Sequence, residues 1–139
     1  MPFYSCTVPE GTLTDESKAA LAAEIARIHA EINHVPPARV FVAFSEPPAT
    51  SVFAGGEQRR LLVVSGWARR GHPQESTTRL ALELASAAAR ISGVDEDHVM
   101  VVIEDSPASS AVEGGRALPE PGHEEEWLRQ AEAEAKAGS

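Results

Sequence analysis

The sequence predicts an α+β protein in which two tandem β-α-β units, related by a pseudo-twofold axis, form a four-stranded sheet with two helices on one face. Three observations predict this class: the chain repeats at a constant offset of 59 residues, each copy has strand, helix and strand patterns in turn, and the expected strands are strongly apolar. We expect a single domain over residues 1–139, with repeat 1 at about 2–56, repeat 2 at about 60–115, and a C-terminal loop and short helix over 116–139.

The repeat is visible as identical residues at this one offset. In the first copy the identical positions are Glu16, Ser17, Leu21, Glu24, Ala26, Val40, Val42, Pro48, Ala49, Ser51, Gly55 and Gly56. One structural unit used twice explains them, because both copies share the same packing needs.

The first copy opens with an expected strand over residues 3–8. Thr14, followed by two acidic residues, is typical of a helix start, and the helix ends over 33–37, where prolines cannot continue its hydrogen bonding. A second strand is expected over 39–45. The apolar positions of the helix recur at spacings of three and four: Leu21, Ile25, Ile28 and Ile32.

The second copy follows the same order. A strand over 61–67 leads to a helix that Gly93 ends, and a last strand covers 98–104. The apolar face of this helix carries Leu80, Leu84, Ala87 and Ile91. A crossover through a helix makes the two strands of each copy parallel.

Three strand segments, 40–44, 61–64 and 99–103, are apolar at every position. Continuously apolar strands are buried on both faces, yet two helices cover only one face. We therefore expect an oligomer in which partner chains cover the second face.

The C-terminal part has no counterpart in the repeat. Residues 105–125 contain Pro107, Pro119 and Pro121 and are expected to be loop, followed by a charged helix over 124–136 anchored by Trp127 and Leu128.

The charge and composition of the chain exclude several classes of partner and location. A formal charge of −9 argues against nucleic acid and anionic membranes as partners. No apolar stretch is long enough to span a bilayer and the N-terminus lacks a signal-peptide pattern. The lone Cys6 cannot form an internal disulfide and fits a core position in a cytoplasmic protein.

Positions where the two copies differ in chemistry are candidates for function. The pairs are Pro2 with Leu61, His29 with Ala88, Glu113 with Ala54, and Arg69 with Glu10. Pro2 becomes a terminal secondary amine if Met1 is removed, and such an amine titrates near enough to neutrality to act as a base. The alternative is a proline that simply begins a strand.

The other candidates suggest binding of an acid. Arg69 follows the third strand, where ligand-binding groups collect, and its guanidinium suits a carboxylate. Arg70 and His72 are weaker candidates, and Arg70 also fits a solvated strand end. His29 lies beside the apolar helix face, where a lone histidine is more often a core residue than a functional one. We expect no metal and no cofactor, because no ligand spacing or phosphate loop is present.

The sequence resembles the tautomerase superfamily, and over about residues 2–128 it resembles the cis-3-chloroacrylic acid dehalogenase family. The segments that carry the resemblance are 2–4 (Pro-Phe-Tyr), 52–56 (Val-Phe-Ala-Gly-Gly), 66–69 (Gly-Trp-Ala-Arg) and the long run 112–124. The resemblance implies a homotrimer, Pro2 as acid and base, Arg69 and His29 as ligands of a substrate carboxylate, and Glu113 as the group that activates water.

Two departures bear on the activity. The family's second carboxylate-binding arginine is His72 in this sequence, and the tyrosine of its last strand is Val102. We therefore expect a cofactor-independent tautomerase acting on 2-oxo acid enols such as phenylpyruvate enol. The alternatives are a hydratase or weak hydrolytic dehalogenase of 3-carbon unsaturated acids such as cis-3-chloroacrylate, and a non-catalytic trimeric binding module.

Overall fold

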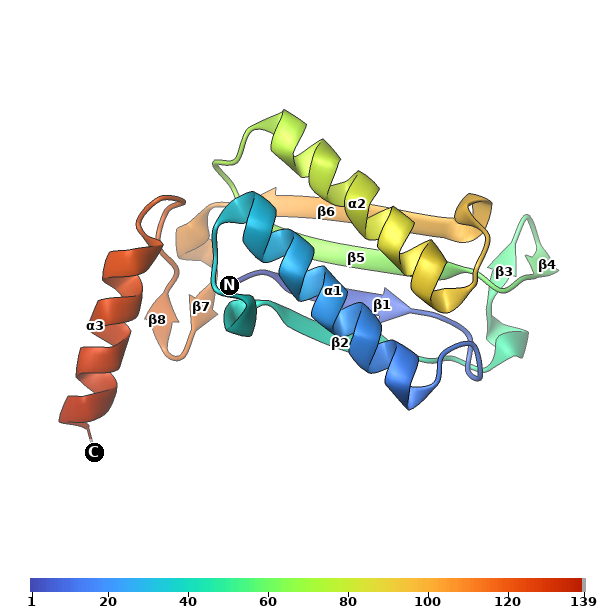
Figure 1. Cartoon of the computed structure of the whole chain (residues 1–139), viewed down its shortest axis with the longest axis horizontal. Coiled ribbons are helices and arrows are strands. Elements are labelled where there is room, and N and C mark those ends of the chain that lie inside the picture. Colours follow the sequence, from blue (N-terminus) through green and yellow to red (C-terminus); the bar gives the residue numbers. More distant parts are fainter. Residues whose placement is uncertain (139) are drawn as a thin grey trace.

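The computed structural model describes residues 1–138 and contains one four-stranded mixed sheet covered on one face by two long helices (Figure 1). The sheet order is β2-β1-β5-β6, formed by β1 (Phe3–Thr7), β2 (Phe41–Ser45), β5 (Leu62–Arg69) and β6 (Val99–Ser106). β1 runs parallel to β2, β5 runs parallel to β6, and the two central strands are antiparallel. The predicted four-stranded sheet with two helices is confirmed.

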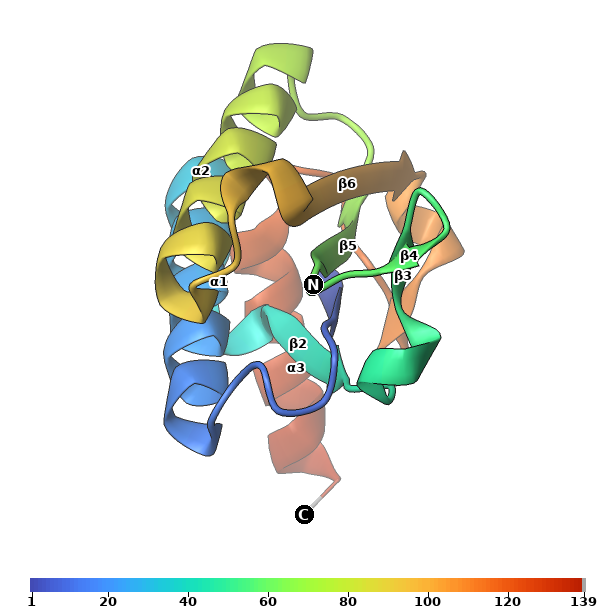
Figure 2. The same cartoon turned by 90° about the vertical axis from the view of Figure 1, so that its right-hand side faces the viewer.

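The helices α1 (Asp15–Asn33) and α2 (Gln74–Ser92) begin and end at positions 59 residues apart. Thr14 caps α1, because its side chain accepts a hydrogen bond from the Ser17 backbone, whereas Pro73 begins α2 without a side-chain cap. Both helices end on a left-handed residue, His34 in the first copy and Gly93 in the second. Both helices lie on the same side of the sheet (Figure 2).

The core lies between the helices and this face of the sheet. Its fully buried side chains come from the central strands and from the helix faces that the sequence pattern identifies: Tyr4, Cys6, Leu62, Val64, Leu21, Ile25, Leu80 and Leu84. Burial raises the pKa of the Cys6 thiol to about 12, so this cysteine is a core residue.

The second face of the sheet is open in the single chain. Phe3 is 48% exposed, Phe41 49% and Met100 60%, and these residues alternate with buried side chains in β1 and with half-buried ones in β2 and β6. No element of the single chain covers this side, as expected from the sequence, and the expectation that partner chains cover it stays a prediction.

Two short hairpins were not predicted. β3 (Phe53–Ala54) pairs with β4 (Glu57–Gln58), and β7 (Val112–Glu113) pairs with β8 (Arg116–Ala117), again 59 residues apart. Both turns consist of two glycines with positive φ, as the tight turn of a two-residue hairpin requires. The stretch 105–125, expected to be loop throughout, thus contains a hairpin.

Strand ends also differ from the prediction. The expected strand over 39–45 starts only at Phe41, because a 3₁₀ turn, η1 (Pro37–Arg39), precedes it, and η3 (Glu96–His98) precedes β6 in the same way. β5 and β6 each extend two residues further than expected at their carboxyl ends, which places Arg69 inside β5.

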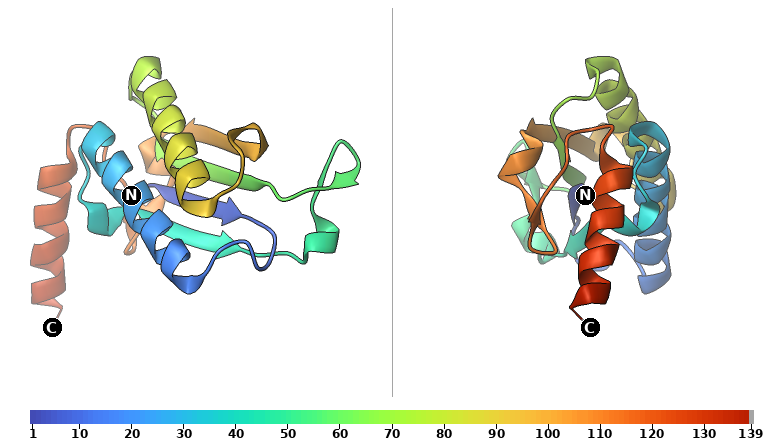
Figure 3. Two further views of the ribbon diagram at one scale, coloured as in Figure 1. Left: turned by 45° about the vertical axis from the view of Figure 1, so that its right-hand side comes forward. Right: turned by 90° about the vertical axis from the view of Figure 1, so that its left-hand side faces the viewer.

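The C-terminal helix α3 (Glu124–Ala137) lies at the end of the molecule where the chain begins, beside the β7–β8 hairpin (Figure 3). Trp127 anchors it, since this side chain is 7% exposed and its Nε1 donates to the Ala117 carbonyl at 2.8 Å. Position 139, the end of the predicted C-terminal segment, lies outside the described residues.

Candidate active site at the N-terminus

A hollow of about 330 Å³ opens at the start of β1. The chain terminus, the beginning of β2, the end of β5 and the β7–β8 hairpin meet around it. Its lining residues are Met1, Pro2, Phe3, Phe41, Trp67, Ala111, Val112, Glu113, Gly114 and Leu118. Two of the predicted catalytic residues, Pro2 and Glu113, therefore line one cavity although they are far apart in the sequence.

Glu113 forms two ion pairs at this hollow. One carboxylate oxygen lies 2.9 Å from the terminal amine of Met1, and the other accepts from Nη1 of Arg39 at 2.9 Å. The side chain is only 10% exposed, so these ion pairs are shielded from water. Glu113 thus joins the chain terminus to a cation from the first repeat.

The terminal amine is buried and surrounded by charge. Burial lowers its pKa below the ordinary value of 8.0, and the positive charges of Arg69 and Arg39 act in the same direction, whereas Glu113 opposes them. The amine also donates to the backbone carbonyl of Arg39. An amine whose pKa is lowered in this way is suited to proton transfer near neutral pH.

Pro2 is buried at the start of β1, and its carbonyl accepts from the Phe41 backbone N–H at 3.1 Å. While Met1 is attached, the nitrogen of Pro2 is an amide nitrogen without basic character. The Met1 side chain packs into the hydrophobic core with 4% exposure, directly beside this hollow. Removal of Met1 would expose the Pro2 nitrogen and enlarge the cavity next to it.

Arg69 lies at the end of β5 and is 4% exposed. Nη1 donates to the Pro119 carbonyl and Nη2 to Glu124, both at 2.7 Å. Burial alone would raise the pKa of Glu124, but the hydrogen bond and charge of Arg69 prevail and lower it, so the pair stays ionised. A guanidinium has five N–H groups, and these two contacts leave others for a substrate.

His29 is buried on α1 with 2% exposure. Nδ1 lies 2.7 Å from the Tyr4 hydroxyl and Nε2 lies 3.3 Å from Nδ2 of Asn33. Burial lowers the pKa of His29 to about 3, and the charges of His72, the N-terminus and Arg69 add to this effect. The histidine is therefore neutral at neutral pH, and both ring nitrogens are engaged within the protein. To bind a substrate carboxylate, His29 would have to release its contact with Tyr4 or with Asn33, and this role stays a prediction.

The weaker candidates differ from each other. His72 is half-buried, and its pKa is lowered by burial and by the charge of Arg69, which places it close to that guanidinium. Arg70 points outward, with a side chain 61% exposed, and pairs with Asp105 at 2.9 Å. His72 thus lies within the field of Arg69 as a neutral group, whereas Arg70 is a solvated strand end.

The opposite end of the sheet has the pseudo-symmetric counterpart of this hollow. This smaller cavity, about 210 Å³, is lined by Ala54, Leu61, Val63, Asp97, His98, Val99 and Met100. Leu61 replaces Pro2 and Ala54 replaces Glu113, so this end lacks both the terminal amine and the carboxylate. The two cavities share their backbone framework, and only one of them carries the reactive groups.

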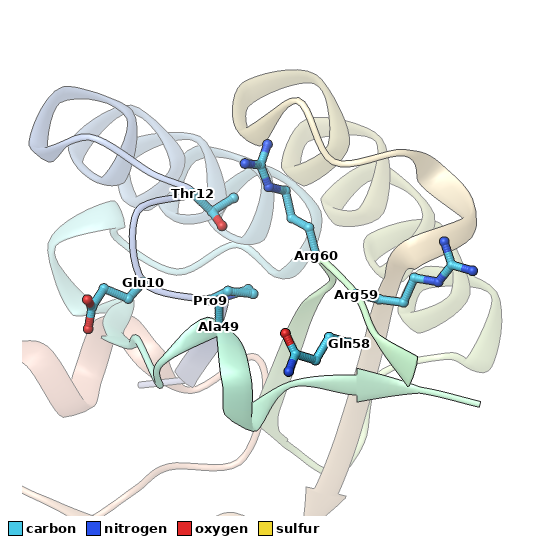
Figure 4. A pocket seen from close by; sticks show the side chains of 7 residues that line it. All are labelled: Pro9, Glu10, Thr12, Ala49, Gln58, Arg59 and Arg60. Carbon is cyan, nitrogen blue, oxygen red and sulfur yellow. The ribbon is translucent and has the colours of Figure 1, made fainter. Parts of the chain in front are cut away.

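A further hollow of about 230 Å³ lies between the β3–β4 hairpin and the loop after β1 (Figure 4). Arg59 and Arg60 line it together with Gln58, but the two guanidinium groups point in different directions. Arg59 pairs with Glu57 at 3.2 Å. Groups that point apart do not hold one carboxylate between them, so this hollow is not a second acid-binding site of the predicted kind.

Two residues of the N-terminal site were missed in the sequence. Arg39 was assigned to a strand, and Glu124 was recognised only as part of a similar segment. Arg39 could have been found from the repeat, because its counterpart is His98 and the pair therefore differs in chemistry. No local pattern shows that Glu124 reaches Arg69, since the contact depends on how the C-terminal loop folds back.

The fold and the site together define a class of small α+β proteins in which the chain terminus lies at a cavity at one end of a doubled β-α-β sheet. The sequence matches a tautomerase family described as "Putative oxalocrotonate tautomerase enzyme" over residues 1–132. The chain belongs to this family and so to the tautomerase superfamily. A search of curated proteins by sequence gave no match.

Solved structures show the same relationship. A crystal structure of N1, a member of the cis-3-chloroacrylic acid dehalogenase family, is 26% identical, with a TM-score of 0.88 and 99% coverage of both chains. Native Ps01740 is 30% identical, with a TM-score of 0.77, over 80% of this chain and 99% of that one. A wild-type symmetric trimer of fused 4-OT shares the fold at 23% identity, with a TM-score of 0.77 over 84% of this chain and 94% of that one. The resemblance to the dehalogenase family, predicted from segments such as 112–124, is confirmed over the full length.

Among residues 1–138, no helix is long and apolar enough to cross a membrane, and no cluster of histidine, cysteine and acidic side chains suited to a metal ion is found.

Proposed function

We propose that this chain is a cofactor-independent tautomerase that acts on the enols of 2-oxo acids, such as phenylpyruvate enol, with the terminal amine of Pro2 as its acid and base. One observation supports this proposal: the chain terminus with Pro2 lines the same cavity as Glu113, and the charge of Arg69 acts on the terminal amine there, which in the structure is that of Met1. Enol–keto exchange needs a base near neutrality and a cation beside the acid group of the substrate, and the site has both.

In the proposed reaction the neutral amine of Pro2 takes the proton of the enol hydroxyl. The electrons of the O–H bond form the C=O bond, and the C=C electrons form a new C–H bond at carbon 3 with the proton that the amine returns. Arg69 supplies positive charge for the substrate carboxylate, whereas His72 and His29, whose pKa values burial lowers, are neutral and offer at most a hydrogen bond. No cofactor enters these steps, because the proton that leaves oxygen is balanced by the one that carbon gains.

Hydration of a short unsaturated acid is a second candidate, and the position of Glu113 favours it. A shielded carboxylate that lines the hollow, with one oxygen beside the terminal amine and the other beside Arg39, is suited to orient and deprotonate a water molecule. His72 and Val102 stand where the dehalogenases of the similar family have arginine and tyrosine, which weakens the support for efficient dehalogenation.

Replacing Glu113 with glutamine is expected to separate these two activities. Conversion of cis-3-chloroacrylate or a related 3-carbon acid should be lost, whereas enol–keto exchange should stay within about tenfold of the parent, because its proton carrier is the amine. Glu113 raises the pKa of the terminal amine, so its loss lowers that pKa and moves the acid limb of the tautomerase pH–rate profile to lower pH. Product detection by NMR and steady-state rates across pH give both readouts. Equal loss of the two activities would contradict the assignment.

We also propose that the chain forms a homotrimer through the open face of the sheet. This face exposes four large apolar side chains: Phe3, Phe41, Met100 and Val102. Exposed apolar surface on a sheet is typical of a face that another layer covers. Similar proteins support this proposal, since a fused 4-OT structure is described as a symmetric trimer. The hollow at Pro2 includes Phe3 and Phe41, so a neighbouring chain on this face would also close the site.

Met100→Glu is expected to convert the trimer to a monomer and to weaken the activity, because it places a charge in the apolar interface. Light scattering coupled to gel filtration measures the mass of the species. Leu82→Glu is the matched control: Leu82 is 67% exposed on α2, on the helix side of the sheet, and its substitution should leave the assembly unchanged. A trimer that persists in Met100→Glu would contradict the proposed interface.

A further inference from the structure

Arg39 is the residue of the N-terminal site that neither the sequence pattern nor the proposed reaction uses. It ends the 3₁₀ turn η1, and Nη1 lies 2.9 Å from the Glu113 oxygen that does not face the terminal amine. Its backbone carbonyl accepts from the same amine. Arg39 therefore contacts both groups of the ion pair, one through its side chain and one through its backbone.

The C-terminal helix holds Arg39 in this position. The guanidinium lies over the Trp127 ring at 5.6 Å, and Arg116 covers the same ring at 5.1 Å. Trp127 is itself fixed by its hydrogen bond to Ala117. The helix α3 has no counterpart in the repeat, and through Trp127 it supports the Arg39 side chain at the site.

The repeat shows that this arrangement is not a packing requirement. At the opposite end of the sheet the counterpart of Arg39 is His98 and that of Glu113 is Ala54. Both members of the ion pair are present at the end with the chain terminus, and both are missing at the other, although the 3₁₀ turn and the hairpin are the same. The backbone therefore folds without the pair.

We infer that Arg39 is a positioning residue that holds one oxygen of Glu113, so that the carboxylate is shared between a guanidinium and the terminal amine. This inference deepens the proposed function and rests on it for its role in catalysis, but the arrangement of the three groups is independent of turnover. An unshared Glu113 would bind the protonated amine with its full charge and keep it from acting as a base.

Four ionisable groups act on the amine or lie within its field: Glu113 from β7, Arg39 from η1, Arg69 from β5 and His29 from α1. Arg39 lowers the pKa of the amine, whereas Glu113 raises it. Loss of Arg39 removes a positive neighbour and also releases Glu113 to the amine, and both changes raise the pKa. His29 stays neutral in this range and does not contribute a charge.

The test is the pH dependence of acetylation of the terminal amine by trace acetic anhydride, read by mass spectrometry of the N-terminal peptide. The intact mass first establishes whether Met1 or Pro2 carries the amine, and the titration is valid for either. Arg39→Gln is expected to shift the titration to higher pH, and Arg39→Lys is expected to restore part of the shift. In a Glu113→Gln background the shift caused by Arg39→Gln should shrink markedly, because Arg39 then has no carboxylate to hold.

Arg116→Gln is the matched control. It removes the other arginine on Trp127, whose side chain binds the Trp127 carbonyl, Gln130 and Glu134, and it leaves the backbone pairing of residues 113 and 116 in the hairpin in place. Its titration should equal that of the parent. The inference is overturned if Arg39→Gln causes no shift, if the shift is equally large without Glu113, or if Arg116→Gln reproduces it. Because labelling needs no substrate, these outcomes are distinct from a failure of the proposed tautomerase, which would appear only as absent enol turnover.

Discussion

Replacing Pro2 with alanine is expected to reduce the turnover of phenylpyruvate enol by roughly 100- to 10,000-fold, the usual contribution of a positioned acid and base. Alanine leaves a primary amine on a freely rotating bond, whereas the proline ring fixes the direction of its nitrogen. The measurement is the initial rate of enol loss, followed by its ultraviolet absorbance, with subunit mass and thermal unfolding recorded for both proteins.

A second experiment keeps the Pro2 side chain and converts only its nitrogen from an amine to an amide. Protein released from a fusion with one extra residue before Pro2 has an amide there, which cannot accept a proton, and it should be as inactive as the alanine variant. Arg59→Gln is the control, because Arg59 lies at the opposite end of the sheet beside Glu57 and should leave the rate unchanged. Full activity with the blocked nitrogen would exclude Pro2 as the base, whereas absence of turnover in the unblocked protein as well would favour a non-catalytic trimeric module.

Replacing Gly66 with alanine is expected to lower the free energy of unfolding by about 3 kcal/mol, the upper end of the usual cost of overpacking. Gly66 lies opposite Tyr4 in the central antiparallel pair of the sheet. A Cβ at this position would lie 2.4 Å from Cε1 of Tyr4 and 2.6 Å from Cδ1. The tyrosine has no room to move, since it is fully buried and its hydroxyl binds His29.

Urea denaturation measures this loss. Ser65→Ala, a substitution at an exposed position of the same strand, is the control and should change the stability little. In a Tyr4→Leu background, which removes most of the ring, the penalty of Gly66→Ala should fall, because the two residues are in contact. An unchanged midpoint for Gly66→Ala alone would show that the ring of Tyr4 has more freedom than its packing indicates.

Much of the fold could be predicted because both copies of the unit obey the same packing rules. The offset of 59 places α1 and α2 correctly, and the apolar face of α1, from Leu21 to Ile32, is buried as expected. The hairpins were harder to predict because strands of two residues carry no periodicity. The Gly55-Gly56 and Gly114-Gly115 pairs were visible as repeat identities, and both are signals for a two-residue turn.

The site could be predicted only in part. Differences between the copies identified Pro2 and Glu113, which do line one hollow, and Arg69, whose charge acts on the terminal amine. The contacts of Arg69 with Pro119 and Glu124 depend on a loop that folds back over 50 residues of sequence, and no local pattern encodes such a contact. The roles assigned to these residues remain predictions until the variants are measured.

Only one of the two cavities at the ends of the sheet can contain a terminal amine, because the two copies of the unit belong to one polypeptide chain. A polypeptide has a single amino terminus, and Leu61, which occupies the place of Pro2 in the second copy, is joined on both sides by peptide bonds. Even a proline at position 61 would therefore offer no basic nitrogen. Two copies in one chain therefore share a single terminal amine, and the cavity at the other end of the sheet can have no such group of its own.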